Sequence, residues 1–378
     1  MAKERKVVRE GICLPLMLIT IILTCIGLVM VFSTTYNDSL IHSNNTSYLS
    51  DFRNQAIVAV VGMLFMFGIS RMDYRLLKRP KIFWSLYVAS IIALIAVFFF
   101  APVYDSHRWI RVPGIGITIQ SSEIAKVVAI IFASLYTSAN KWWYRDAKSW
   151  FRLLLPIGIL AALIIVEPDL STTMCLLGAT VVVMFVSGMP WGFLAVGVAG
   201  IGALIPLMIS VVGYQSRRFD AWLHAWDDPK DVGYQIVQSL YAIGDGGLFG
   251  VGLGNSKQKI THLPMSDTDY IFSIICEEFG FVGAVLVIGL YVAYAFFGIK
   301  IAMEASDRFG TYLAVGITTL IVLQAFINMG VATNVLPSTG LTLPFISKGA
   351  SSLAVTLCST GILLSISSHK TRKPNKEE

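Results

Sequence analysis

The chain has 378 residues, of which 55% are hydrophobic and only 14% are charged, and its mean hydropathy is +0.70. Soluble domains normally carry about a quarter charged residues, so this composition excludes an ordinary soluble protein and indicates a polytopic membrane protein. The net charge of +6 reflects lysines and arginines placed around apolar segments and does not indicate a nucleic-acid partner. All five cysteines fall inside apolar segments without metal-ligand spacing, so we expect neither disulfides nor a cysteine metal site.

Ten apolar segments approach the length of roughly 20 residues that a helix needs to cross a bilayer. They cover about residues 13–33, 54–70, 81–101, 119–139, 153–170, 171–188, 190–213, 269–299, 310–332 and 346–367. The fifth and sixth are separated only by Glu167-Pro168-Asp169, and the eighth is long enough to tilt or to extend past the bilayer. The sequence therefore predicts an all-α polytopic membrane protein, a single domain over residues 1–378 with ten transmembrane helices.

The distribution of lysine and arginine predicts how the chain is oriented. Most of these residues lie in the N-terminal segment, in the short loops near 71–81, 141–152 and 300–308, and in a basic tail at 368–378. Because positive charge accumulates on the cytoplasmic side, we expect both termini to be cytoplasmic. The long loop 214–268 between the seventh and eighth segments is then extracytoplasmic.

Arginines at the predicted outer surface are the first candidate binding residues. Arg108 precedes Trp109 in the loop after the third segment, and Arg217 and Arg218 open the long loop. Arginine grips phosphate in a bidentate manner, so these residues suit an anionic headgroup or a pyrophosphate. The alternative is generic interfacial anchoring beside tryptophan.

Two charged residues lie within the fourth apolar segment. Glu123 and Lys126 are three residues apart and so share one face of a helix. Charges inside a membrane segment are costly and are commonly paired or functional. A structural ion pair with a snorkelling lysine and a functional pair lining a cavity remain equal alternatives.

The turn Glu167-Pro168-Asp169 places two carboxylates between two spans. Proline breaks the helix and Asp169 is suited to cap the next one, with Ser171 and Thr172 nearby. Capping explains Asp169, and it leaves Glu167 without an explanation.

A glycine-rich run follows the middle of the long loop. Gly244 to Gly254 lacks the GKS or GKT ending of a nucleotide loop and does not follow a strand, so we exclude a P-loop. A bendable backbone that re-enters near the membrane is the better interpretation. The preceding residues 234–241 are amphipathic enough for a surface helix.

Asp267 and Asp269 precede the eighth apolar segment, and two interpretations compete. Ser266-x-x-Asp269 matches a capping box, and acidic residues are favoured in the first turn of a helix. Capping accounts for both aspartates without any function. The helix dipole would also keep Asp269 ionised, and only partial burial would raise its pKa towards a value useful for a base.

Several short motifs, spread over most of the chain, form one recognisable pattern when they are taken together. They are Arg108-Trp109-Ile110 with Gln120-x-Ser122-Glu123-x-x-Lys126; Glu167-Pro168-Asp169-Leu170; Asp228-Pro229, Gly233-Tyr234-Gln235, Gln238-Ser239 and the glycine run to Gly254; Leu263-Pro264 through Asp269; and Asn328 with Leu336-Pro337 through Leu343-Pro344-Phe345-Ile346-Ser347. In this pattern the chain resembles the SEDS family (shape, elongation, division and sporulation proteins), the peptidoglycan polymerases that include FtsW, RodA and SpoVE. Ten spans with both ends inside are also that family's topology.

The resemblance implies a catalytic role for Asp269, which ends the segment corresponding to the family's LPExHTD motif. Three departures accompany it. Met265 and Asp267 stand where the family has Glu and His, Ser121 replaces Pro, and Lys348 and Ala350 replace the Tyr and second Gly that follow LPFIS. They change local charge, so we expect them to affect partner or substrate preference more than activity.

The implied reaction is polymerisation of lipid II at the outer face of the bacterial cytoplasmic membrane. Asp269 would be the base or would position Mg²⁺ or Mn²⁺, since hard oxygen ligands suit these ions. Arg108, Arg217 or Arg218 would hold the pyrophosphate, with Glu123 and Lys126 deeper in the cavity. No organic cofactor is expected.

The family further implies a class B penicillin-binding protein (transpeptidase) as partner, together with other divisome or elongasome membrane proteins. A lipid II flippase or a non-catalytic scaffold for a transpeptidase remains the alternative function. Division, cell shape and sporulation are all open as the process served, with a lean towards the FtsW and SpoVE branch.

Overall fold

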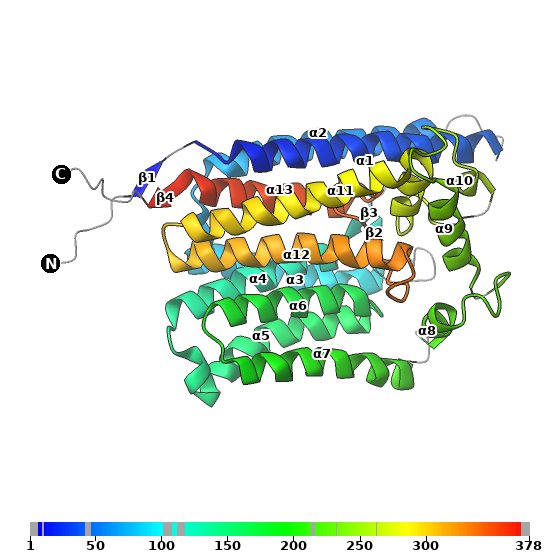
Figure 1. Ribbon diagram of the computed structural model, residues 1–378. Coiled ribbons are helices and arrows are strands. Elements are labelled where there is room, and N and C mark those ends of the chain that lie inside the picture. The colour runs from blue at the N-terminus through cyan, green and yellow to red at the C-terminus, as the bar shows by residue number, and fades with distance from the viewer. Residues whose placement is uncertain are drawn as a thin grey trace.

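The protein is described here from a computed structural model covering residues 7–9, 11–41, 47–100, 108–111, 118–212, 216–231, 233–261 and 263–371. Ten long helices lie side by side in one bundle (Figure 1). They are α1 (Leu14–Ile41), α2 (Ser47–Arg71), α3 (Pro80–Ala96), α4 (Ser121–Ala139), α5 (Ala147–Val166), α6 (Leu170–Val186), α7 (Trp191–Val212), α11 (Ile271–Glu304), α12 (Arg308–Ala332) and α13 (Ala350–Ser368). Each coincides with one predicted apolar segment.

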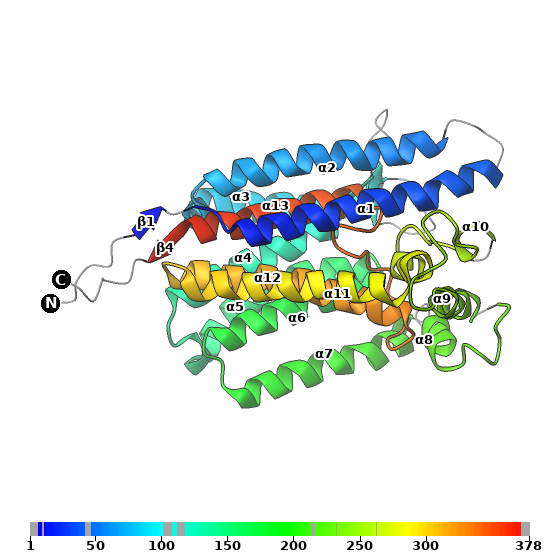
Figure 2. The same cartoon turned by 45° about the horizontal axis from the view of Figure 1, so that its top comes forward.

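The centre of the bundle is formed by the helices with the most buried faces. α12 packs against α4, α6 and α11, and α13 runs along α2, whereas α7 lies at one edge of the bundle (Figure 2). The outer helices expose large apolar side chains, such as Leu64 on α2, Phe151 on α5 and Phe296 on α11. Outward-facing apolar side chains of this kind suit a hydrocarbon environment, so the bundle is that of a multi-pass membrane protein.

Eight helices within the described residues are long and apolar enough to cross a membrane. α6 is apolar but has only 17 residues. It is short because Asp169 caps its start, where Pro168 cannot continue α5, and because Gly188 with φ of +110° ends it. The division between the fifth and sixth predicted segments therefore falls at Glu167-Pro168-Asp169, as expected.

Short strands and helices close the two ends of the bundle. β1 (Val7–Arg9) pairs antiparallel with β4 (His369–Thr371) at one end, so the first and last described segments meet there (Figure 1). β2 (Trp109–Arg111) pairs with β3 (Thr118–Gln120) at the other end, which also carries α8 (Ser216–Leu223), α9 (Tyr234–Asp245) and α10 (Gln258–Thr261). The predicted amphipathic helix at 234–241 is confirmed as the start of α9. The remaining short elements are 3₁₀ turns: η1 (Tyr74–Lys78), η2 (Val97–Phe99) and η3 (Trp143–Arg145).

The glycine-rich run docks against a kink in α11. At Gly280 the backbone of α11 leaves the helical region, with φ of 67° and ψ of −163°. The run pairs with this kink through main-chain hydrogen bonds, from Val251 N to Glu277 O at 2.9 Å and from Phe281 N to Gly247 O at 2.9 Å. The non-helical backbone is thereby satisfied by protein, which is what such a backbone requires at membrane depth.

Glycine is needed at this contact because no side chain fits. A Cβ at Gly280 would lie 2.4 Å from Gly250 N and 2.5 Å from Leu248 O, and one at Gly246 would lie 1.9 Å from Cys276 O. The positive φ of Gly280 adds a backbone penalty for any other residue. The glycine pattern therefore reflects close backbone packing.

We predict that Gly280→Ala lowers the free energy of unfolding by about 2 kcal/mol or more, since it combines a backbone clash with an unfavourable φ. Gly289→Ala in the same helix is the matched control, because a Cβ there meets nothing within 4 Å. Thermal unfolding of both variants in detergent measures the difference. Equal stability of the two variants would contradict this account of the kink.

Candidate active site

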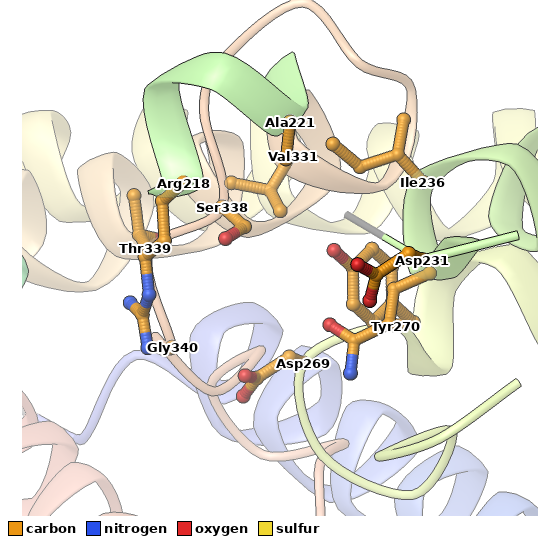
Figure 3. Close-up of a pocket in the computed structure, with 11 residues that line it drawn as sticks. Arg218, Ala221, Asp231, Ile236, Asp269, Tyr270, Val331, Ser338, Thr339 and Gly340 are labelled. Atoms are coloured by element: carbon orange, nitrogen blue, oxygen red, sulfur yellow. The ribbon is translucent and has the colours of Figure 1, made fainter. Parts of the chain in front are cut away.

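A cavity of about 410 Å³ opens at the end of the bundle that carries α8 and α9. Its walls come from both helices, from the end of α12, and from the loops before α11 and α13 (Figure 3). The lining residues are Arg218, Ala221, Asp231, Gln235, Ile236, Asp269, Tyr270, Val331, Ser338, Thr339 and Gly340. The Asp269 carboxylate and the Arg218 guanidinium reach into the same space (Figure 3).

The backbone around Asp269 is held by three separate hydrogen-bond donors. The carbonyl of Asp267 accepts from Lys348 N at 2.9 Å, and that of Thr268 accepts from Ser347 Oγ at 2.6 Å. The carbonyl of Asp269 itself accepts from Asn328 Nδ2 at 2.9 Å. Three successive carbonyl groups are thus fixed by α12 and by the loop before α13, and Asp269 is placed on a rigid support.

Burial and neighbouring charges set the acidity of Asp269. The pKa of its carboxyl group is raised to about 6, and desolvation is the largest cause. Asp267 and, to a smaller extent, Asp169 also raise this pKa, whereas Arg218 and, to a smaller extent, Arg108 lower it. The side chain remains partly accessible from the cavity. A carboxyl with this pKa is mostly ionised at neutral pH and is still a stronger base than an ordinary aspartate.

The capping-box interpretation of Ser266 and Asp269 is wrong. α11 begins at Ile271 with Tyr270 in the capping position, and no side-chain capping bond is formed there among the described residues. Residues 264–270 instead form a compact turn with Met265 at φ of +57°, and Thr268 N and Tyr270 N both donate to Met265 O. Asp269 therefore lies before the helix and faces the cavity.

Buried polar atoms surround the cavity. Tyr270 Oη, Thr339 Oγ1 and Asn328 Oδ1 are buried and have no hydrogen-bond partner among the described residues. Sequence reasoning missed Tyr270 and Thr339, since an aromatic residue at a helix start and a threonine in a loop carry no distinctive pattern. Of these residues, Tyr270 and Thr339 line the cavity. Buried polar atoms normally find partners, so these two offer hydrogen bonds to a polar ligand.

Arg108 stabilises the turn between α5 and α6. It is buried, and its guanidinium donates from Nε to Glu167 O at 3.2 Å and from Nη2 to Pro168 O. The start of α6, directly after this turn, contacts the cavity wall through Ser171 Oγ, which donates to Thr339 O at 2.6 Å. Arg108 thus lies within electrostatic range of Asp269 without lining the cavity.

The two carboxylates of this turn behave differently. Asp169 caps α6 by accepting from Thr172 N at 3.1 Å, which confirms the predicted cap, and it also accepts from Gln120 Nε2 at 3.2 Å. Glu167 is fully buried, with Ser121 Oγ 3.4 Å from its Oε1 and no described partner for Oε2. Burial raises the pKa of Glu167 to about 8, with a further contribution from Asp169. Glu167 is thus largely protonated at neutral pH.

Glu123 and Lys126 form a buried ion pair within the helical bundle. Lys126 Nζ lies 2.9 Å from Glu123 Oε1 and donates to Gln324 Oε1 at 2.7 Å. Gln324 Nε2 in turn donates to Thr342 O at 3.1 Å. The pair ties α4 to α12 and to the loop before α13. It does not line the cavity at Asp269.

A second buried ion pair was not anticipated from the sequence. Lys259 Nζ lies 2.5 Å from Glu278 Oε1 and donates to Ser33 Oγ at 2.8 Å. Next to it, Glu277 accepts from Lys257 N at 2.7 Å. Two glutamates within an apolar segment are themselves a signal of a paired or functional charge, and this pair attaches α10 to α1 and α11.

Arg217 belongs to α8, but its side chain lies outside the described part of the structure. No group of three histidine, cysteine or acidic side chains arranged to hold a metal ion occurs among the described residues. All five cysteines are free, as expected.

These features define a polytopic helical membrane protein with a carboxylate and an arginine facing a cavity at one end of the bundle. Residues 14–372 match the FtsW/RodA/SpoVE family, described as cell cycle proteins. The chain belongs to this family.

Relatives and solved structures agree with this membership. The chain is 37% identical to the stage V sporulation protein E of Bacillus subtilis strain 168, over 94% of this chain and 96% of that protein. It is 34% identical to the probable peptidoglycan glycosyltransferase FtsW of Geobacter sp. strain M18, over 95% and 97%.

Among solved structures, a chain of a peptidoglycan synthase complex said to coordinate polymerization and crosslinking superposes with a TM-score of 0.76. It is 26% identical, with 94% of this chain and 97% of that chain covered. RodA of Thermus thermophilus gives a TM-score of 0.68 at 25% identity, with 96% and 98% covered.

We predict that Lys126→Met lowers the free energy of unfolding by roughly 3–5 kcal/mol, because it leaves Glu123 buried without its cation. Adding Glu123→Gln should restore a large part of the loss. Denaturant unfolding in detergent measures both variants, with Lys148→Met at an exposed site as the control. A Lys126→Met variant as stable as the control would show that the pair has no structural role.

Proposed function

We propose that this chain is a peptidoglycan glycosyltransferase that polymerises lipid II into glycan strands, serving cell division, cell shape or sporulation. The observation that carries the proposal is the cavity in which Asp269, with a raised pKa, faces Arg218. The named relatives include a probable peptidoglycan glycosyltransferase. Family membership and cavity chemistry therefore support the same activity.

The proposed topology has ten transmembrane helices, cytoplasmic termini and an extracytoplasmic loop 214–268 in the bacterial cytoplasmic membrane. The distribution of basic residues supports this orientation. It places the cavity on the outer side, at the end opposite the β1–β4 pair. The lipid tail of the substrate would stay in the bilayer while its sugars enter the cavity.

In the proposed reaction, the GlcNAc 4-hydroxyl of the acceptor attacks the anomeric carbon of the donor's MurNAc. The new C–O bond forms as the bond to undecaprenyl pyrophosphate breaks, and Asp269 removes the hydroxyl proton. A general base contributes typically 10²–10⁴-fold to such a step. The rigid support of three held carbonyls favours this role, since a base must be positioned before the reaction begins.

Arg218 is the proposed ligand of the leaving pyrophosphate, because positive charge at the departing oxygens stabilises the transition state. Arg217, its neighbour on α8, and Arg108 are proposed as additional sources of positive charge. Glu123 and Lys126 are proposed to support the cavity from below. Tyr270 and Thr339, with their unpartnered polar atoms, are suited to hydrogen-bond the sugars.

Asp269 is the residue of this site that suits a divalent cation bound together with substrate phosphates. Mg²⁺ commonly binds one or two carboxylates together with substrate phosphates, and Asp269 supplies one such carboxylate at the cavity wall. We therefore propose that Asp269 would be the protein ligand of Mg²⁺ or Mn²⁺, and that the ion would supply positive charge to the substrate pyrophosphate.

A class B penicillin-binding protein is the proposed partner, within a divisome or elongasome. One structural relative belongs to a complex said to coordinate polymerization and crosslinking. This relation supports a transpeptidase partner for the present chain.

We predict that Asp269→Asn, nearly isosteric, folds normally and loses polymerisation by at least about 100-fold, as removal of a general base implies. The measurement is gel analysis of products from labelled lipid II and divalent cation, with and without a class B transpeptidase. Asp227→Asn is the matched control, since Asp227 is exposed and contacts His224 in the same loop.

Wild-type polymer yield from Asp269→Asn would refute the assignment of the base. Absence of polymer from the wild-type chain under every condition would favour a flippase or a scaffold. Translocation assays in sealed vesicles and binding of the transpeptidase would then separate those two functions.

The pH dependence follows from the pKa of Asp269. Both proposed roles, base and metal ligand, need the ionised carboxylate, so the polymerisation rate should rise with pH through about 6 and level off above it. Values of kcat/KM for lipid II, which report the pKa of the free enzyme, test this from pH 5 to 8, with folding at each pH checked by thermal unfolding. A rate that falls over this range would contradict the role of an ionised Asp269.

A further inference from the structure

Lys348 connects three segments that are far apart in the sequence. Its Nζ lies 2.9 Å from Asp51 Oδ2 on α2 and 2.9 Å from Asp267 Oδ2 in the turn before α11. Its main-chain N donates to Asp267 O at 2.9 Å. One lysine in the loop before α13 therefore holds α2 and the Asp269 turn together, and we call these three residues the Asp51–Lys348–Asp267 cluster.

Neighbouring contacts reinforce the cluster. Gln55, one turn beyond Asp51 on α2, is buried and donates from Nε2 to Ser347 O at 3.2 Å, while its Oε1 accepts from Gly349 N at 3.3 Å. The outer end of α2 thus contacts the residues on both sides of Lys348 as well as its side chain. The loop before α13 cannot shift relative to α2 without breaking these bonds.

The charges of the cluster favour this arrangement. Burial alone would lower the pKa of Lys348, but Asp267 and Asp51 outweigh it and raise the pKa, so the ammonium is retained. The lysine and aspartate side chains are between 21% and 42% exposed, so each ion pair alone is worth little energy. A specific geometric role is therefore more consistent with the cluster than a large contribution to overall stability.

The position of the cluster relative to Asp269 indicates what that role is. Asp267 is two residues before Asp269, and its carbonyl and that of Thr268 are the two bound by Lys348 N and Ser347 Oγ. Asp267 and Lys348 are also two of the positions at which this chain differs from the family motifs. The two residues contact each other, so each supplies the opposite charge with which the other is paired.

We propose that Lys348 is a positioning residue for the reaction at Asp269. Its ammonium holds the 264–270 turn against the end of α2 that carries Asp51, and so fixes the direction of the Asp269 carboxylate. This inference rests on the proposed glycosyltransferase function. Lys348 itself does not line the cavity. Its removal should therefore slow the chemical step and leave lipid II binding nearly unchanged, because misplacement of a catalytic group by about 1 Å costs up to about 100-fold.

The test compares Lys348→Met, Lys348→Arg and the double variant Asp267→His with Lys348→Tyr, which introduces the residues that the family has at both positions. Two readouts are used on the full chain in nanodiscs: kcat and KM for lipid II, and hydrogen–deuterium exchange of residues 264–270. Lys148→Met serves as the control for loss of an exposed lysine.

We expect Lys348→Met to lower kcat about tenfold with KM changed less than about twofold, and to speed exchange in 264–270 specifically. Lys348→Arg should keep most of the activity, and the double variant should recover to within about threefold of wild type. A Lys348→Met variant with wild-type kcat and wild-type exchange would overturn the proposal. A Lys348→Arg variant that loses as much kcat as Lys348→Met would also overturn it.

The two readouts separate this inference from the proposed function. If the wild-type chain makes no polymer, the proposed function fails. Hydrogen–deuterium exchange still reports whether Lys348 holds the 264–270 turn. If the wild-type chain polymerises and exchange is unaffected by Lys348→Met, only the positioning role fails.

Discussion

The structure depends on how the main-chain hydrogen-bonding groups are satisfied where the polar segment before Ile271 enters the apolar helix α11. A chain at this boundary must hydrogen-bond its main-chain groups within the protein. The carbonyls of Asp267, Thr268 and Asp269 do so through Lys348, Ser347 and Asn328. Further along α11, at Gly280, the glycine-rich run closes against the kink of this helix. A carboxylate is thereby presented to a cavity on a support that the bundle itself holds in place.

Hydropathy and local patterns predicted much of the fold and part of the site. The ten apolar segments overlap with helices because an apolar run of bilayer length can satisfy its main-chain hydrogen bonds in few structures other than a helix. Asp169 caps α6 as expected, and Glu123 pairs with Lys126 as helical spacing suggested. These successes share one feature, since each interaction lies within a few residues of sequence.

The failures involve contacts between distant segments. Ser266 and Asp269 resemble a capping box, but contacts from α12 and from the loop before α13 hold residues 264–270 in a turn ahead of the helix. The Lys259–Glu278 pair joins the short helix α10 to the apolar helix α11. Neither the pairing of Asp267 with Lys348 nor the packing of Gly280 against Gly250 follows from spacing. In each case the partner is chosen by tertiary structure.

The central claim is that the lipid II headgroup reacts in the cavity between Asp269 and Arg218. The most direct measurement is a cryo-EM structure of the Asp269→Asn variant with bound lipid II, in which the substrate cannot turn over. The account predicts sugar density beside residues 269–270 and 338–340, with the pyrophosphate at Arg218. Headgroup density at any other place on the protein, with this cavity empty, would contradict it.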